Sequence, residues 1–290
     1  MKQIPFGRTG LSVSPLGLGA GPIGDPALSE DHAGTLLNRA VDRGVTLIDT
    51  APSYGESEAR IGRHLSWRRG DFVLSTKLGY GVPGVADWTP DCIDKGVDRA
   101  LARMGTDRID IAHLHSCPLE TLQRSGVVEA LGRAVHDGRV GVAAYSGDND
   151  ALAWAVRAGA FGGVQFSLNI VDRKALALLD EMRSRGLGLI VKRGLANAVW
   201  RFAQPPERPD LAEYWRRFTA LGLDRPADIA DRALAFCLDA APDATVLVGT
   251  TRIDHLEHDA KVAAAHVPGG ATGFPAQAYA AVGGDWPSLI

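Results

Sequence analysis

The stretch Val45–Gly55, which reads VTLIDTAPSYG, decides the fold and supplies the first functional candidates. Its first four residues are apolar or β-branched, which is typical of a buried strand. Pro52 and Gly55 then end the strand. Asp49 therefore lies where the strand leaves the core, and the phenol of Tyr54 follows across a short loop. An Asp at a strand end often only begins a turn, so a functional interpretation depends on what the other strands carry at the same end.

The same unit of strand and helix repeats along the chain. Residues 1–15 alternate around Gly7–Gly10, which is typical of a hairpin. Helix caps are predicted at Ser29 and Thr89, the latter followed by a proline. Strands are predicted over residues 16–20, 45–49, 72–77, 109–115, 140–146, 163–169, 187–192 and 245–249. Further helices are predicted over about 121–137, 148–158, 172–185, 211–221, 226–240 and 252–264.

This alternation predicts an α/β protein, a (β/α)₈ TIM barrel with an N-terminal β-hairpin. We expect one domain over 1–290, with the hairpin at 1–15 and a C-terminal tail at 266–290. The alternative is an open doubly wound sheet, because Gly19–Gly24 (GAGPIG) matches the dinucleotide pattern GxGxxG after a strand. In that motif the helix opens within the glycines. Here Pro22 and Pro26 intervene and helical periodicity resumes only near Ser29, which favours the barrel.

Composition excludes several classes of partner. The net charge of −3 gives no basic surface for nucleic acid, and no run of about 18 apolar residues predicts a membrane span. The start of the chain lacks the apolar core of a signal peptide. The three cysteines are widely spaced and odd in number, so they predict reduced thiols and no metal site. We expect a cytoplasmic protein.

Chemistry-bearing side chains stand at the ends of three consecutive predicted strands. In a (β/α)₈ barrel these ends converge on one mouth, and the next two strands after Asp49 end at Lys77 and His115. An ammonium stabilises a phenolate, so Lys77 would make Tyr54 a better proton carrier. Such a site suits protonation of an oxygen on which negative charge develops, as when a carbonyl receives hydride. His113, two residues deeper on the same face, is expected to be a core residue.

The DTAPSYG stretch with Lys77 and His115 resembles the catalytic tetrad of the aldo-keto reductases, and the resemblance extends over nearly the whole chain. It implies that Tyr54 is the general acid/base, that Lys77 and Asp49 tune it, and that His115 orients the carbonyl. It also implies a nicotinamide cofactor, usually NADP(H) with NAD(H) possible, and a small-molecule carbonyl or alcohol substrate. Ser146 and Gln165 match positions that hold the nicotinamide carboxamide, and Asn169 lies in the same stretch.

The chain departs from the family pattern at two other cofactor positions. Lys192 and Arg193 stand where many members of the family place an aromatic that stacks on nicotinamide, so this contact is either lost or replaced by a basic group. The loop after the eighth strand, Gly249-Thr250-Thr251-Arg252, is the expected site of the cofactor's phosphate. The spacing from Thr251 to Asp254 predicts a capping box and a helix beginning near Arg252. Exposed N–H groups there would favour an anion, which makes Arg252 the candidate for phosphate binding.

Other functions remain open at this point. Trp88 and the Trp200–Trp215 loop are predicted to line a partly apolar pocket. One alternative is a sugar or pyridoxal-type dehydrogenase that works in the oxidising direction. The other is a nucleotide-sensing binding protein with little turnover, as in the channel β-subunits of this fold family. The intact tetrad favours the enzyme.

Overall fold

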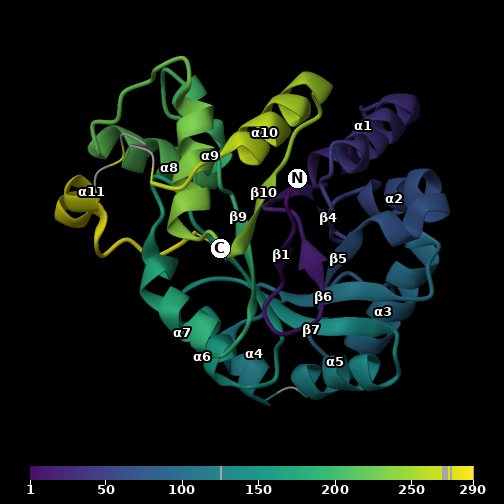
Figure 1. The fold of residues 1–290 in the computed structure, drawn as a ribbon. Coiled ribbons are helices and arrows are strands. Elements are labelled where there is room, and N and C mark those ends of the chain that lie inside the picture. Colours follow the sequence, from purple (N-terminus) through teal and green to yellow (C-terminus); the bar gives the residue numbers. More distant parts are fainter. Residues whose placement is uncertain (125, 270–273, 275, 290) are drawn as a thin grey trace.

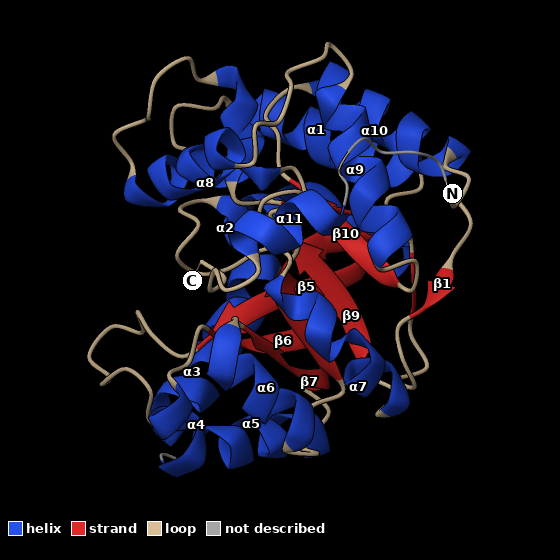
Figure 2. Ribbon diagram, turned by 90° about the vertical axis from the view of Figure 1, so that its left-hand side faces the viewer, coloured by secondary structure: helices blue, strands red, loops and turns tan. Residues whose placement is uncertain are grey.

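The computed structural model describes residues 1–124, 126–269, 274 and 276–289. Parallel strands close into a barrel in the order β10-β3-β4-β5-β6-β7-β8-β9, so β10 pairs with β3. Figure 2 shows these strands at the centre with helices around them. The closed barrel confirms the predicted fold and excludes the open sheet. The barrel strands are β3 (Leu16–Gly19), β4 (Leu47–Asp49), β5 (Val73–Leu78), β6 (Ile109–His115), β7 (Val140–Ser146), β8 (Gly163–Ser167), β9 (Gly188–Lys192) and β10 (Ala244–Val248).

Helices surround this barrel and follow the chain around it (Figure 1). Ser29 and Thr89 cap α1 and α3 as predicted, each accepting the backbone N–H three residues on. The helices are α1 (Glu30–Asp42), α2 (Ser57–Leu65), α3 (Pro90–Met104), α4 (Leu119–Arg124), α5 (Val127–His136), α6 (Asn149–Arg157), α7 (Leu179–Ser184), α8 (Pro209–Ala220), α9 (Ile229–Ala240), α10 (Ile253–Ala265) and α11 (Ala276–Gly283). Within the described residues, none of these helices is long and apolar enough to cross a membrane.

The N-terminal hairpin closes the barrel end opposite to the mouth. Its strands β1 (Ile4–Pro5) and β2 (Ser12–Val13) pair antiparallel. The ring of Phe6 follows β1 and is buried at the starts of β8 and β9. A Cβ atom at Gly163 or Gly188 would lie 2.9 Å or 2.4 Å from this ring. These strands therefore begin with glycine because the aromatic plug occupies the space of a side chain.

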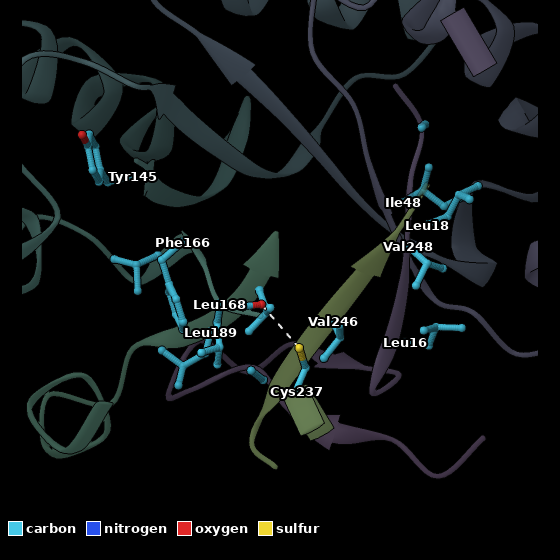
Figure 3. Close-up of a cluster of buried hydrophobic side chains, with 14 of the residues drawn as sticks. Leu16, Leu18, Ile48, Tyr145, Phe166, Leu168, Leu189, Cys237, Val246 and Val248 are labelled. Atoms are coloured by element: carbon cyan, nitrogen blue, oxygen red, sulfur yellow. Dashed lines mark hydrogen bonds between the residues drawn. The ribbon is translucent and has the colours of Figure 1, made fainter. Parts of the chain in front are cut away.

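The main hydrophobic core lies between the strands and the helices. Leu18, Ile48 and Val248 pack on one side of the barrel wall, and Phe166 and Leu189 on another (Figure 3). Cys237 of α9 reaches this layer, and its thiol donates to the carbonyl of Leu168 over 3.4 Å. All three cysteines are buried and free.

Two local helix predictions need correction. The helix expected over 121–137 is two helices, because α4 ends at Arg124 and α5 begins after Gly126, whose φ is 74°. The segment 172–185 begins with a 3₁₀ helix over Lys174–Leu178 before α7. Within the predicted tail 266–290, residues 270–273, 275 and 290 lie outside the described residues, and α11 lies inside it. The GAGPIG segment forms a 3₁₀ helix over Pro22–Gly24, so the first helix does not open within it.

Candidate active site

The predicted residues lie at the carboxyl ends of the strands, where the parallel register can be followed from one strand to the next. Asp49 pairs in register with Ser75, Lys77 with His113, and Ser146 with both His115 and Gln165. These ends surround a cavity of about 520 Å³ at the barrel mouth. Strand-end residues that line it are Gly19, Asp49, Lys77, His115, Ser146, Gln165, Lys192, Leu247, Val248 and Gly249, and loop residues include Gly21, Pro22, Tyr54, Ser116, Arg193, Leu195, Asn197, Ala198, Arg201, Arg208 and Leu211.

Lys77 and Asp49 form a buried ion pair at the floor of the cavity. Lys77 Nζ lies 2.6 Å from Asp49 Oδ2 and donates to the Thr50 carbonyl over 2.8 Å. Only 2% and 4% of the two side chains are exposed. Burial opposes the charged lysine, but the Asp49 carboxylate and the Tyr54 oxygen outweigh it and raise the pKa of Lys77 above its ordinary value. Lys77 is therefore a permanent cation beneath the cavity.

Asp49 is held by a second group that does not reach the cavity. Its Oδ1 accepts a hydrogen bond from Ser75 Oγ over 2.8 Å, and this hydroxyl lies 3.0 Å from His113 Nε2. His113 is fully buried, and burial lowers its pKa to about 4. As expected from the sequence, His113 is a neutral core residue, and here it supports Ser75 and through it Asp49.

Tyr54 lies over this ion pair in the loop that follows β4. Its backbone N–H donates to the Ala51 carbonyl over 3.0 Å, which closes the turn. Lys77 Nζ lies 4.9 Å from the centroid of the phenol ring. The His115 ring meets it edge to face, with the centroids 6.1 Å apart. The structure thus brings together the four residues that the sequence predicted as a tetrad.

His115 is a neutral imidazole in a cationic environment. Burial, followed by the charges of Lys77 and Lys192, lowers its pKa to about 2. Its Nδ1 lies 2.6 Å from the Tyr80 hydroxyl. The contact between Tyr80 and His115 could not be predicted, because the sequence spacing of a loop residue and a strand residue does not indicate that they meet.

The side chains of Ser146 and Gln165 form a polar corner of the cavity. Ser146 Oγ donates to Gln165 Oε1 over 2.7 Å. The amide nitrogen of Gln165 is buried and has no hydrogen-bond partner within the described part of the chain. A buried N–H without a partner is unfavourable by about 1–3 kcal/mol, so this corner is suited to a ligand that supplies an acceptor.

Lys192 and Arg193 line the cavity at the end of β9. Lys192 Nζ lies 2.8 Å from Asp148 Oδ2, and Asp148 Oδ1 also accepts the backbone N–H of Ser167 over 2.7 Å. Burial lowers the pKa of Lys192, and Asp148 opposes that shift. Arg193 donates to the Leu289 carbonyl, so the end of the chain is bonded to the cavity wall.

The structure does not bring Asn169 into the cavity. Its amide nitrogen donates to the Arg193 carbonyl over 3.1 Å and to the Tyr214 hydroxyl over 3.3 Å. Its amide oxygen accepts the Val171 N–H over 3.0 Å. All of these bonds lie inside the protein, so the side chain positions the Arg193 loop and leaves no group free for a cofactor.

The loop after β10 differs in detail from its prediction. Gly249 lines the cavity, whereas Thr250, Thr251 and Arg252 lie beyond its lining. The helix begins near Arg252 as predicted, but Arg252 itself is the N-cap and the capping box is absent. Asp254 forms an ion pair with Arg252 instead of reaching back to Thr251, and the Arg252 N–H donates to Thr250 Oγ1 over 3.0 Å.

The predicted pocket wall is correct for the Trp200–Trp215 loop, since Arg201, Arg208 and Leu211 line the cavity, but wrong for the Trp rings. Trp88, Trp200 and Trp215 are partly buried against the core and are not among the residues that line the cavity. The same loop presents Asn197, Arg201 and other polar groups to the cavity. The Trp rings pack inward because their apolar surface is more stable in the core than at a wet mouth.

Comparison with known proteins agrees with this geometry. The model of the Aldo/keto reductase family matches residues 15–268. L-galactose dehydrogenase of Arabidopsis thaliana is 28% identical over 88% of this chain and 85% of its own length. D-threo-aldose 1-dehydrogenase of a Pseudomonas species is 27% identical over 90% and 92%. A solved structure described as an aldo-keto reductase of Pseudomonas aeruginosa is 30% identical over 90% of this chain and 94% of that one, with a TM-score of 0.73.

The closed barrel, together with the match to the family model and to a named dehydrogenase, defines the protein as an oxidoreductase. The chain belongs to the aldo/keto reductase family.

Proposed function

We propose that the protein transfers hydride between a nicotinamide dinucleotide and a carbonyl or alcohol carbon, with Tyr54 as the proton carrier. The observation that carries the proposal is the arrangement of the Tyr54 phenol over the buried Lys77–Asp49 pair, edge to face with His115. Lys77 stabilises negative charge on the phenol oxygen, and Asp49 keeps the lysine charged and in place. Neutral His115 has a ring N–H with which to orient a substrate oxygen.

The Ser146–Gln165 corner fits the cofactor. A carboxamide presents both a C=O acceptor and N–H donors, and the unpartnered amide nitrogen of Gln165 requires an acceptor. Ser146 and Gln165 would therefore hold the nicotinamide end, and a nicotinamide bound there supplies or accepts the hydride. The cationic side chains of Arg193, Arg201 and Arg208 at the same cavity suit the negative charges of a dinucleotide.

Arg252 is the proposed determinant for the phosphorylated cofactor. Its exposed side chain stands at the N-cap of α10, where free N–H groups favour an anion. Its ion pair with Asp254 must open or share the guanidinium for this role. We infer a preference for NADP(H), with Lys192, Gly249, Thr250 and Thr251 as further contacts near the dinucleotide.

A small polyhydroxylated aldehyde or lactol is the proposed substrate class. Polar and charged side chains share the cavity lining with aliphatic ones such as Leu195, Leu211 and Leu247, and the Trp rings pack against the core. Two relatives are named as dehydrogenases of sugars, which supports sugar oxidation as the alternative direction. We also infer that residues 1–290 work as one domain, because the hairpin closes the barrel and Leu289 contacts Arg193 at its mouth.

A turnover screen tests the proposal. Aldehydes, ketones, aldoses and sugar alcohols are assayed in both directions with NADPH, NADH and their oxidised forms. The expected result is turnover with at least one class of small polar substrate. Tight cofactor binding without turnover across the screen would favour the sensing role instead.

A further inference from the structure

We propose that Tyr80 sets the tautomer of His115, so that the single ring proton stays on Nε2, facing the cavity. This inference rests on the proposed role of His115 in orienting substrate. Tyr80 does not line the cavity, so it acts through His115 and is a positioning residue.

Tyr80 is held against the imidazole by its own surroundings. Its hydroxyl lies 2.6 Å from His115 Nδ1, and the two rings stack with centroids 5.4 Å apart at 26°. On another side Trp88 contacts the Tyr80 ring edge to face at 5.8 Å. The backbone N–H of Trp88 donates to the Gly79 carbonyl over 2.7 Å. Gly79 has a φ of 131°, and a Cβ there would lie 2.1 Å from the Trp88 ring. Glycine is therefore required for Trp88 and Tyr80 to adopt these positions.

A neutral histidine must choose which nitrogen carries its proton. Burial keeps the imidazole uncharged, and the positive charges of Lys77, Lys192 and Arg193 add to this effect. A neutral ring has one N–H donor and one lone pair. With the proton on Nδ1, Nε2 would present a lone pair to the cavity, and this lone pair would repel a carbonyl oxygen. With the proton on Nε2, it donates to that oxygen.

The hydrogen-bond chain beyond Tyr80 favours the productive tautomer. Burial raises the pKa of Tyr80, so the phenol keeps its proton and can donate it to Nδ1. Ser53 Oγ lies 3.3 Å from the same phenol oxygen and is exposed. Because Ser53 is exposed, its oxygen can accept hydrogen bonds from water while its hydroxyl donates to the Tyr80 oxygen. The direction of the chain is then from Ser53 to Tyr80 to His115 Nδ1.

Nitrogen NMR of the protein labelled with ¹⁵N-histidine tests this directly. The His115 signals are assigned by their loss in His115→Asn. We expect the wild type to have the proton on Nε2, and Tyr80→Phe, which removes only the hydroxyl, to populate both tautomers. Tyr145→Phe is the matched control, because it removes a buried hydroxyl from the neighbouring strand β7, where this hydroxyl donates to the Cys117 carbonyl over 3.1 Å.

The rate of carbonyl reduction is the second measurement. Losing one hydrogen bond of about 1 kcal/mol should lower kcat for carbonyl reduction about fivefold in Tyr80→Phe, with cofactor affinity unchanged. A wild-type proton on Nδ1, a tautomer that Tyr80→Phe does not alter, or an unchanged kcat would overturn the proposal. Absence of any turnover, with the Nε2 tautomer present and dependent on Tyr80, would instead refute the proposed function and leave the tautomer assignment standing.

Discussion

Lys77 Nζ lies 2.6 Å from Asp49 Oδ2 at the end of two adjacent strands, and both side chains are almost fully buried. Removing two charges from water is unfavourable unless they neutralise each other and satisfy their remaining hydrogen bonds. Thr50 and Ser75 satisfy them here. The pair therefore serves stability and the proposed chemistry together, and either partner alone should be harmful.

Asp49→Asn is expected to destabilise the protein by about 3–5 kcal/mol, because it leaves a buried ammonium without its counter-ion. Urea unfolding measures the change. Asp49→Asn combined with Lys77→Met should recover part of the loss, since no isolated charge remains. Asp91→Asn is the control, because the Asp91–Lys95 pair is more than half exposed and is worth less than about 1 kcal/mol. Equal losses from Asp49→Asn and Asp91→Asn would contradict this account.

His113 should make stability fall with acidity. Its pKa is about 4 in the folded protein and 6.5 as its ordinary value. Below pH 6.5 the unfolded chain takes up a proton that the folded protein does not, so the contribution of His113 is full above pH 6.5 and declines towards pH 4. We expect the stability advantage of the wild type over His113→Asn to shrink by about 2 kcal/mol between pH 7 and pH 4.5. Urea unfolding at both pH values measures it, and an advantage independent of pH would exclude a buried neutral His113.

Gln165→Leu should weaken binding of the whole cofactor about tenfold, because it removes the amide nitrogen proposed to bind the carboxamide. Fluorescence titration with NADPH measures this. The fragment 2′,5′-ADP, which lacks nicotinamide, is the control ligand and should bind the variant and the wild type equally. Equal losses for both ligands would move Gln165 away from the nicotinamide end.

Arg252→Ala should lower affinity for NADPH about tenfold and leave affinity for NADH unchanged, because only NADPH carries the extra phosphate. Asp254→Asn should raise the affinity for NADPH, since it frees the Arg252 guanidinium from its ion pair. Arg232→Ala is the control, an exposed arginine paired with Asp228 on α9. The assignment fails if Arg252→Ala weakens both cofactors equally, or neither.

The strand ends were predictable because two independent patterns agree there. Apolar runs define the strands, and the parallel register then fixes which residues meet. The register pairs Asp49 with Ser75 and Lys77 with His113, so Lys77 and His115 each lie two residues beyond the partner of the preceding site residue. All three side chains nevertheless line the same cavity, as predicted from their places at the strand ends. The barrel itself follows from the repeated alternation of strand and helix.

Contacts between loops were not predictable. Tyr80 reaches His115 and Asp148 reaches Lys192 only through the paths of their loops. The helix α2 is not among the predicted helices, because it has only nine residues and few of them are apolar. The inward packing of the aromatic rings near Trp200 could not be predicted, because aromatic content alone does not tell which side of a loop faces the core.

In the proposed carbonyl reduction, Tyr54 carries the proton. Tyr54→Phe keeps the ring and removes only the hydroxyl, so the fold and cofactor affinity should persist. Loss of a general acid lowers a rate by about 10²–10⁴-fold. Tyr145→Phe, which removes a hydroxyl outside the cavity, is the control and should react as the wild type does.

The most direct measurement is single-turnover oxidation of enzyme-bound NADPH by a reactive aldehyde, followed by absorbance in wild type and Tyr54→Phe. We predict a rate about 10²–10⁴-fold slower in Tyr54→Phe, with the dissociation constant for NADPH unchanged. Equal rates would remove Tyr54 from the mechanism and contradict the proposed function of this site.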